Sequence, residues 1–284
     1  GASIADVLEM SVSEAQRLFH QEPKILRGLE ALASIGLGYL KLGQPSPTLS
    51  GGESSRVKLA AELARPASGP TLYVFDEPTT GLSSEDLTVL LHVLNQLVDR
   101  GHTVVAVAHH LELLKAVDWI VDLGPEAGKE GGEVVVTGPP EAVAAHPRSH
   151  TGRALGRILH SQKGRRPRTS KKKEPPDTSP RDPGDRCNAI RLQGVKTHNL
   201  KELEVEIPHH ALTVVTGVSG SGKSSLAFDT LYWEGRRRYA ENLKTYARRF
   251  LKSSGEGSLE SVQGLTPTLA CQSREGRPHP RSTV

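Results

Sequence analysis

Cysteine and long apolar runs are both scarce in this chain. It holds two cysteines, Cys187 and Cys271, which are far apart and outside any C-x-x-C pair. Two such thiols build neither a disulfide framework nor a zinc site by themselves, and free thiols are typical of a reducing compartment. No apolar run is long enough to span a bilayer. We therefore expect a cytoplasmic location and no membrane partner.

Aromatic residues are also rare, at 4% of the 284 residues, whereas hydrophobic residues make up 36%. A packed core is therefore possible, and it must be mostly aliphatic. Methionine occurs once, at Met10, and the chain starts Gly-Ala-Ser-Ile without an initiator. We expect that this is not a natural start. The formal net charge of +4 is compatible with a nucleic-acid partner without arguing strongly for one.

Aliphatic residues are missing altogether from residues 160–187, which are rich in Lys, Arg, Pro, Ser and Asp. Such a stretch cannot bury a core, so we expect a disordered or extended linker. Its basic cluster could contact DNA phosphate, but a solvated spacer is the simpler interpretation. The linker divides the chain into residues 1–159 and 188–284.

The first block shows the pattern of an α/β fold. The short apolar runs 71–75 and 103–108 predict buried parallel strands. Between them, Ser83 or Ser84 can cap a helix that leucines mark at helical spacing and that Gly101 closes. Strand, helix and strand together predict a βαβ unit. Two further helices are expected over 24–35 and 51–64.

The second block opens with two alternating segments, 190–195 and 200–208, which predict antiparallel strands. The apolar run 211–216 follows, then a Gly-rich loop, then a predicted helix over 223–231. Residues 236–251 place Tyr239, Leu243, Tyr246 and Phe250 on one helical face. That face could bind nucleic acid together with its basic flanks, although a core-facing stripe is the preferred interpretation.

The Gly-rich loop fits G-x-x-x-x-G-K-[ST] at every fixed position. Glycines let successive N–H groups point at phosphates, and the following helix adds its positive N-terminus. Lys223 would reach the β- and γ-phosphates of ATP, and the Ser224 hydroxyl would hold Mg²⁺. The predicted nucleotide-binding residues are Gly217, Val218, Ser219, Gly220, Ser221, Gly222, Lys223, Ser224 and Ser225.

Acidic and imidazole groups follow the two predicted strands of the first block. Asp76 ends the run L-Y-V-F-D and can hold the Mg²⁺ shell, while Glu77 can orient or deprotonate the attacking water. His109 follows the next strand and can donate to the γ-phosphate. Upstream, Ser50, Gly51 and Gly52 offer a hydroxyl and amides at a helix start, which is again an anion-binding arrangement.

These motifs together resemble an ABC-type ATPase, and longer sequence segments give a more specific resemblance. The segments G-Y-L-K-L-G-Q-P-S-P-T-L-S-G-G-E, V-D-W-I-V-D-L-G-P-E-A-G, T-H-N-L-K-E-L-E-V-E-I-P and S-S-L-A-F-D-T-L-Y-W-E-G-R-R-R-Y resemble the UvrA family, the damage-recognition ATPases of bacterial nucleotide excision repair. The likeness covers nearly all of the chain except the linker.

The resemblance implies an α/β P-loop NTPase of the ABC type, split between two modules. Residues 1–159 would be the C-terminal part of one module and 188–284 the N-terminal part of the next, because the phosphate loop comes last. By resemblance Gln272 matches the glutamine that joins Mg²⁺ and the attacking water. The first block looks like the family's second module and the last block like its first, which implies a duplicated or fused gene.

The same resemblance implies ATP hydrolysis in the full-length protein and an ATP cycle that gates binding of damaged double-stranded DNA and loading of a UvrB-like partner. A second ABC module in cis and a homodimer are expected. Zinc is expected only in flanking modules that this chain lacks, so it should hold no zinc site. Three alternatives stay open: a UvrA-like drug self-resistance ATPase, a transporter's ATP-binding subunit, and a non-catalytic remnant.

Overall fold

The computed structural model describes residues 2–64, 69–161, 188–241 and 259–271. Two compact units divide the chain. The first comprises Gly1–Ser68, Glu77–Arg100 and Cys271–Val284, and the second comprises Gly69–Asp76 and Gly101–Ala270. One of the points at which the chain passes between them lies between Asp76 and Glu77, in the middle of the acidic pair.

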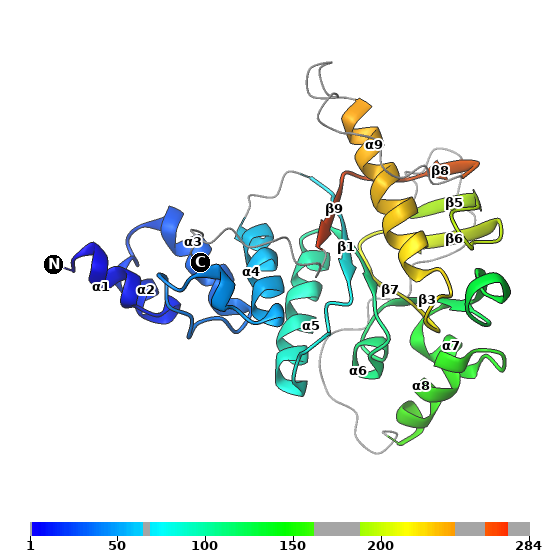
Figure 1. Ribbon diagram of the computed structural model, residues 1–284, viewed down its shortest axis with the longest axis horizontal. Helices are drawn as coiled ribbons and strands as arrows, with labels where there is room; N and C mark the ends of the chain where they lie inside the picture. The colour runs from blue at the N-terminus through cyan, green and yellow to red at the C-terminus, as the bar shows by residue number, and fades with distance from the viewer. Residues whose placement is uncertain (1, 65–68, 162–187, 242–258, 272–284) are drawn as a thin grey trace. The chain divides into compact units, whose positions relative to one another are not determined.

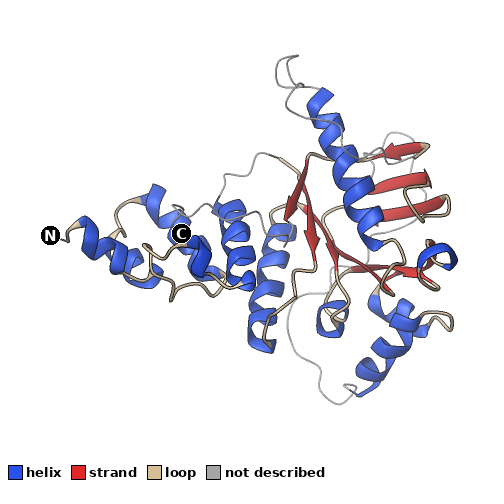
Figure 2. Ribbon diagram, in the orientation of Figure 1, coloured by secondary structure: helices blue, strands red, loops and turns tan. Residues whose placement is uncertain are grey.

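The first unit is helical (Figures 1 and 2). Its elements are α1 (Ile4–Glu9), α2 (Val12–Leu18), α3 (Pro23–Ser34), η1 (Ser46–Thr48), α4 (Gly51–Ala64) and α5 (Ser84–Asp99). The helices expected over 24–35 and 51–64 are confirmed within one residue at each end. Val12, Ile35 and Leu94 are among its fully buried side chains.

Serine starts four of these helices by a reciprocal arrangement of hydrogen bonds. In α5, the Ser83 hydroxyl accepts from the Asp86 N–H, and the Asp86 carboxylate accepts from the Ser83 N–H. Ser3, Ser11 and Ser50 form the same capping box with the acidic residue three positions later. Each box satisfies two backbone donors that a helix start leaves unpaired. The expected cap at Ser83 is confirmed, and Gly101 follows the helix at φ 85°.

The second unit is built on a six-stranded sheet with the order β4-β3-β7-β2-β1-β9. Its strands are β1 (Leu72–Asp76), β2 (Thr103–Val107), β3 (Trp119–Gly124), β4 (Glu133–Gly138), β7 (Leu212–Gly217) and β9 (Thr268–Cys271). The parallel pairing of β1 with β2 confirms the predicted βαβ unit.

Strand β7 lies between β2 and β3 and is parallel to both. Its sequence comes from the second block, whereas β2 and β3 come from the first. Because β7 carries the phosphate loop, the two blocks share one sheet in this structure. Short helices α6 (Leu111–Leu114), η2 (Gly128–Glu130), α7 (Pro140–Ala145) and α8 (His150–Ser161) follow the strands of the first block.

Helix α8 continues to Ser161, so residues 160 and 161 are helical rather than part of a linker. The predicted linker boundary was wrong by these two residues, because an amphipathic helix with buried Leu155 extends through a polar sequence. The rest of the expected linker, residues 162–187, lies outside the described residues.

A three-stranded antiparallel sheet, β6-β5-β8, completes the second unit. Strands β5 (Ala189–Val195) and β6 (Leu203–Pro208) alternate buried and exposed residues, as the sequence predicted, and β8 (Ser261–Gln263) pairs with β5. Apolar side chains of both sheets form one core with the helix that follows the phosphate loop. Ile190, Val205, Val215 and Leu226 are among its members.

That helix differs in two ways from expectation. It is π-helical over η3 (Ser225–Tyr232) before it continues as α9 (Trp233–Glu241), shown from yellow to orange in Figure 1. The preferred core-facing role of the Tyr239 stripe was also wrong at its first member, because the Tyr239 side chain is 54% exposed. The other three stripe residues lie outside the described residues. None of the helices in the described ranges combines the length and the apolarity that a membrane crossing needs.

Candidate nucleotide-binding site

The predicted phosphate loop has the required context of a buried strand before it and a helix after it. Strand β7 ends at Gly217, and the N–H of Leu226 donates to the Gly222 carbonyl in the first turn of the helix. Gly217, Gly220 and Gly222 have φ of 132°, 77° and 102°, which residues with a Cβ rarely adopt. The glycines are therefore needed for the course of the backbone.

Lys223 bends back over the loop that precedes it. Its Nζ donates to the carbonyl oxygens of Gly217 at 3.1 Å and Val218 at 2.9 Å. These bonds keep the ammonium group beside the loop, where an arriving phosphate would compete for it. An ammonium group has three donors and no acceptor, so phosphate oxygens fit it well.

A buried hydroxyl within the loop supports the fit to an oxygen-rich ligand. The Ser221 side chain is fully buried, and its Oγ has no hydrogen-bond partner among the described residues. A buried polar group without a partner costs roughly 1–3 kcal/mol. Ser219 in the same loop and Ser224 at the start of the helix are both exposed. The Ser225 carbonyl accepts from the Thr230 hydroxyl at 2.9 Å.

The strand register brings the predicted groups of the second unit to one edge of the sheet. Asp76 is level with Val107 on β2, and Val107 is level with Val215 on β7. The N–H of Ala108 still bonds the Val215 carbonyl, so β2 leads directly to His109 beside the strand of the phosphate loop. Ligands of open parallel sheets bind at this carboxyl edge.

The other residues predicted to take part in catalysis or Mg²⁺ binding are distributed as follows. Asp76 is the partly buried last residue of β1, and His109 is exposed. Glu77 is the first residue of the second segment of the helical unit, has φ 44°, and accepts from the Thr80 N–H at its carbonyl. Gln272 lies outside the described residues, directly after β9. Across the described ranges, no group of three or more His, Cys, Asp or Glu side chains is arranged to hold a metal ion.

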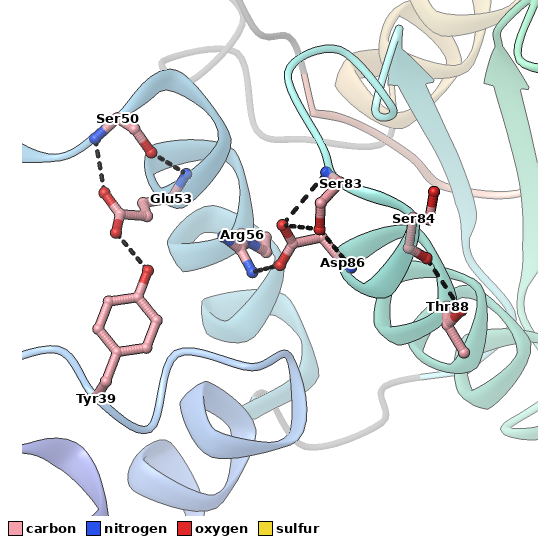
Figure 3. Close-up of polar contacts among 8 residues, drawn as sticks. All are labelled: Tyr39, Ser50, Glu53, Arg56, Ser83, Ser84, Asp86 and Thr88. Atoms are coloured by element: carbon pink, nitrogen blue, oxygen red, sulfur yellow. Dashed lines mark hydrogen bonds and ion pairs between the residues drawn. The ribbon is translucent and has the colours of Figure 1, made fainter.

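The L-S-G-G-E segment lies in the helical unit and starts helix α4 (Figure 3). The Ser50 hydroxyl accepts from the Glu53 N–H at 3.2 Å, and the Ser50 N–H donates to the Glu53 carboxylate at 2.7 Å. Gly51 and Gly52 are the first two residues of the helix. The Ser50 hydroxyl accepts in the cap, so its proton is available for another acceptor such as a phosphate oxygen.

Tyr39 completes this arrangement by donating its hydroxyl to the Glu53 carboxylate (Figure 3). The bonds from the Tyr39 hydroxyl and the Ser50 N–H hold the pKa of Glu53 below its ordinary value. Burial, followed by the bond to Glu53, raises the pKa of the Tyr39 hydroxyl. Glu53 is therefore ionised at neutral pH and acts as a structural anchor for the helix start.

A second set of contacts in Figure 3 connects α4 with α5. The Arg56 guanidinium lies 2.8 Å from the Asp86 carboxylate, which also caps α5 through Ser83. The bond from the Ser83 hydroxyl is the main cause that lowers the pKa of Asp86, and the charge of Arg56 adds to it. Helix α4, which begins in the L-S-G-G-E segment, is thus joined to α5, the helix that follows the D-E-P-T-T-G-L segment.

Sequence reasoning missed a group of residues that hold the phosphate loop from outside. The carbonyl of Gly220 accepts from the Asn199 side chain and from the Gly128 N–H, both at 3.0 Å. These residues are remote in sequence from the loop. The signals available were the glycine-rich run 124–132 and the T-H-N-L segment, neither of which identifies its partner.

No family model matches the chain, but it is similar to known proteins over most of its length. It is 41% identical over 276 residues to UvrABC system protein A from Chlamydia muridarum, covering 97% of this chain and 15% of that protein. It is 55% identical over 161 residues to UvrABC system protein A from Synechocystis, covering 57% of this chain and 17% of that protein. The chain therefore spans less than a fifth of the curated relatives it matches.

A solved structure shows the same likeness. The crystal structure of UvrA2 from Deinococcus radiodurans matches with a TM-score of 0.50 and 31% identity, covering 93% of this chain and 31% of that one. At that coverage the likeness extends over both units. Together with the phosphate loop at the carboxyl edge of a parallel sheet, it establishes the P-loop ABC ATPase fold.

Proposed function

Because this chain is a UvrA-like fragment, we propose that it supplies ATP-binding and ATP-hydrolysing parts of a DNA damage recognition protein in nucleotide excision repair. The observation that carries the proposal is the shared sheet edge. The phosphate loop on β7, Asp76 on β1 and His109 after β2 follow strands that are in register. This is the arrangement that triphosphate binding and hydrolysis need.

The loop amides of residues 217–225 and the Lys223 ammonium would bind the phosphates of ATP. Ser224, Asp76 and Gln272 would hold Mg²⁺, which neutralises phosphate charge when bound. Glu77 would orient the attacking water, and His109 would donate to the γ-phosphate. Ser50, Gly51 and Gly52 would close over a nucleotide held by the phosphate loop of a paired module, since the Ser50 hydroxyl retains its proton.

The proposed division of the chain is the C-terminal part of one ABC module over 1–159 and the N-terminal part of the next over 188–284. The mixed sheet supports it. If the two parts are complementary halves of one kind of module, a strand of the second part is expected to complete the sheet of the first. Here β7 pairs with both β2 and β3.

Relative lengths support a duplicated or fused protein. The 276 matched residues are 15% of the Chlamydia muridarum protein, whereas 161 matched residues are 17% of the Synechocystis protein. The first protein is therefore nearly twice as long as the second. It also matches both blocks of this chain in their present order, whereas the second matches little more than half. A reversed module order is what the junction of two tandem copies would show.

The full-length protein would act in the cytoplasm, within the SOS response to DNA damage. Its ATP cycle would gate binding to damaged double-stranded DNA and the loading of a UvrB-like partner, through a second ABC module in cis and a homodimer. Zinc would belong to flanking modules. Among these statements, the name of the relatives, UvrABC system protein A, supports the part in a Uvr system with further components.

Two measurements test the proposal. The first is the intact mass of the native gene product, detected in cell extract through a peptide of this chain. A mass several times 30.6 kDa supports a multi-module repair ATPase, and a mass near 30.6 kDa overturns it. The second is nucleotide binding and turnover by the full-length product. Binding without turnover, lost in Lys223→Ala, would favour the non-catalytic remnant instead.

A further inference from the structure

The loop between β5 and β6 contacts the phosphate loop and its helix through three successive side chains. The Thr197 and Thr230 hydroxyl oxygens lie 3.0 Å apart, with both side chains buried. His198 Nε2 lies 3.3 Å from the Asp229 carboxylate. Asn199 reaches the phosphate loop itself, where its Nδ2 donates to the Gly220 carbonyl at 3.0 Å.

The Gly220 carbonyl accepts a second hydrogen bond from another segment. The N–H of Gly128 donates to it at 3.0 Å, and Asn199 Nδ2 also lies 3.3 Å from the Gly128 carbonyl. One amide group of Asn199 therefore connects the phosphate loop with the turn after β3. Both lone pairs of the Gly220 oxygen are engaged, which fixes the direction in which this carbonyl points.

That direction also fixes an amide of the phosphate loop. The carbonyl of Gly220 and the N–H of Ser221 belong to one trans peptide, in which the two bonds point in opposite directions. Holding the carbonyl outward on Asn199 and Gly128 therefore turns the Ser221 N–H toward the inner side of the loop. There it bonds the Val218 carbonyl at 3.2 Å, at the long end of the usual range.

The backbone that carries Asn199 has little freedom to move. A Cβ on Gly132 would lie 1.9 Å from the Asn199 carbonyl oxygen, and a Cβ on Gly222 would lie 2.4 Å from Leu200 Cδ2. The N–H of Lys201 also bonds the Gly132 carbonyl at 2.9 Å. Asn199 is thus presented to the phosphate loop from a backbone that is packed on two sides.

We propose that Asn199 is a positioning residue of the nucleotide site, which sets the orientation of the Gly220–Ser221 peptide for phosphate binding. This inference rests on the proposed nucleotide-binding function. The partner it serves is the polyphosphate of a nucleoside di- or triphosphate rather than the base, because its contact is with the loop backbone. Losing one neutral hydrogen bond at a half-buried place predicts a loss of affinity of about fivefold.

The test compares Asn199→Asp with Gln193→Glu in the full 284-residue chain. Both substitutions replace a side-chain amide by an isosteric carboxylate, and the two positions lie in the loop after β5 and in β5 itself. The first removes the donor to the Gly220 carbonyl, whereas the second keeps the acceptor that the Ser261 hydroxyl uses at 2.7 Å. We expect weaker binding of fluorescent ADP and ATP in Asn199→Asp alone, with an unchanged melting temperature in both variants.

A pH profile separates positioning from a general structural effect. A protonated carboxyl at position 199 can again donate to the Gly220 carbonyl. The affinity ratio of wild type to Asn199→Asp should therefore fall as the pH is lowered from about 7 to about 4, through the ordinary pKa range of an aspartate. A ratio that does not change with pH, or equal losses in both variants, overturns the inference.

Hydrogen–deuterium exchange of the nucleotide-free chain keeps the inference separate from the proposed function. Peptides over 217–224 should exchange faster in Asn199→Asp than in wild type and Gln193→Glu. If wild type binds no nucleotide, the proposed function fails, and the exchange alone decides whether Asn199 fixes the loop. Unchanged exchange in Asn199→Asp sinks the positioning role whatever the nucleotide result.

Discussion

Arg56 Nη1 lies 2.8 Å from Asp86 Oδ1 and joins α4, the helix that begins in the L-S-G-G-E segment, to α5. The Arg56 side chain is 10% exposed and the Asp86 side chain 35%. The carboxylate also serves the capping box of α5, so one group stabilises both a helix start and a helix–helix contact. Loss of the pair should therefore be felt in both helices.

Replacing Arg56 by methionine should destabilise the helical unit by about 1–2 kcal/mol. This is less than the roughly 3–5 kcal/mol typical of a broken buried pair, because Asp86 is one third exposed and keeps its bonds from Ser83. Native-state hydrogen exchange of the α4 and α5 amides measures the effect. The matched control is Lys41→Met, which removes an exposed pair with Glu9 and should change little.

Lys223→Ala should weaken binding of ATP and ADP by roughly 10- to 100-fold, since it removes charge-assisted hydrogen bonds to phosphate. Isothermal titration of the full chain measures the affinity. Lys196→Ala is the control, because Lys196 is an exposed lysine of the same unit that pairs with Glu202 at 2.8 Å. An equal loss in both variants would mean that general charge rather than the loop determines binding.

Tyr39→Phe should raise the pKa of Glu53 toward its ordinary value, because the Tyr39 hydroxyl is the main donor that lowers it. A carbon-detected NMR titration of the Glu53 carboxyl reads this directly. The stability that Glu53 contributes is present above the unfolded pKa and is lost as the pH falls through the folded pKa. The variant should therefore lose the stabilising contribution of Glu53 at a higher pH than wild type; identical titrations would contradict the contact.

Asp122 on β3 is buried and accepts from the Ser149 hydroxyl at 2.6 Å and the Thr151 hydroxyl at 2.9 Å. Burial nevertheless raises the pKa of Asp122, outweighing both bonds. Because the pKa of Asp122 is raised in the folded state, folding favours its protonated form. The contribution of this carboxyl to stability is therefore complete at low pH and is lost as the pH rises above the ordinary aspartate pKa of about 3.9.

Asp122→Asn should therefore remove a pH dependence rather than create one. As the pH rises from about 4 to about 7, the free energy of unfolding of wild type should fall relative to that of Asp122→Asn. Urea unfolding followed by the fluorescence of Trp119, on the same strand, provides the series. A difference that is constant with pH would show that the pKa of Asp122 is the same in the folded and unfolded states, which would contradict the raised pKa.

Gly132→Ala and Gly28→Ala should change stability in opposite directions. Gly132 has φ 79° and no room for a Cβ beside the Asn199 carbonyl, so alanine should cost several kcal/mol, of order 2–4. Gly28 lies within α3 with nothing within 4 Å, so alanine should add about 0.5–1 kcal/mol. Thermal unfolding monitored separately in each unit by hydrogen exchange distinguishes the two effects.

Local chemistry allowed much of the fold to be predicted. The Ser83 cap, the Gly101 stop, and the strands around 72–76 and 103–107 depend on neighbours within a few residues. The phosphate loop was recognisable for the same reason, since its glycines and Lys223 act on their own backbone. The π-helical course of Ser225–Tyr232 had no such signal, because apolar residues at helical spacing fit α and π geometry alike.

Long-range partners were the part that could not be predicted. The contact of Asn199 with Gly220 spans 21 residues, and that of Asn199 with Gly128 spans 71. A side-chain amide has no periodicity that identifies its acceptor, so only the folded backbone reveals it. The insertion of β7 between β2 and β3 is hidden for the same reason: buried strands read alike, whichever neighbours they have.

The place of β7 has a consequence for how the chain folds while it is being synthesised. Strands β2 and β3 leave the ribosome first, and their pairing partner is synthesised only after about ninety further residues, several seconds later at about 5–20 residues per second. During that time both edges that β7 will occupy are open to other strands. Until the phosphate loop emerges and β7 closes the sheet, the nascent chain carries two strands whose pairing partner is still missing.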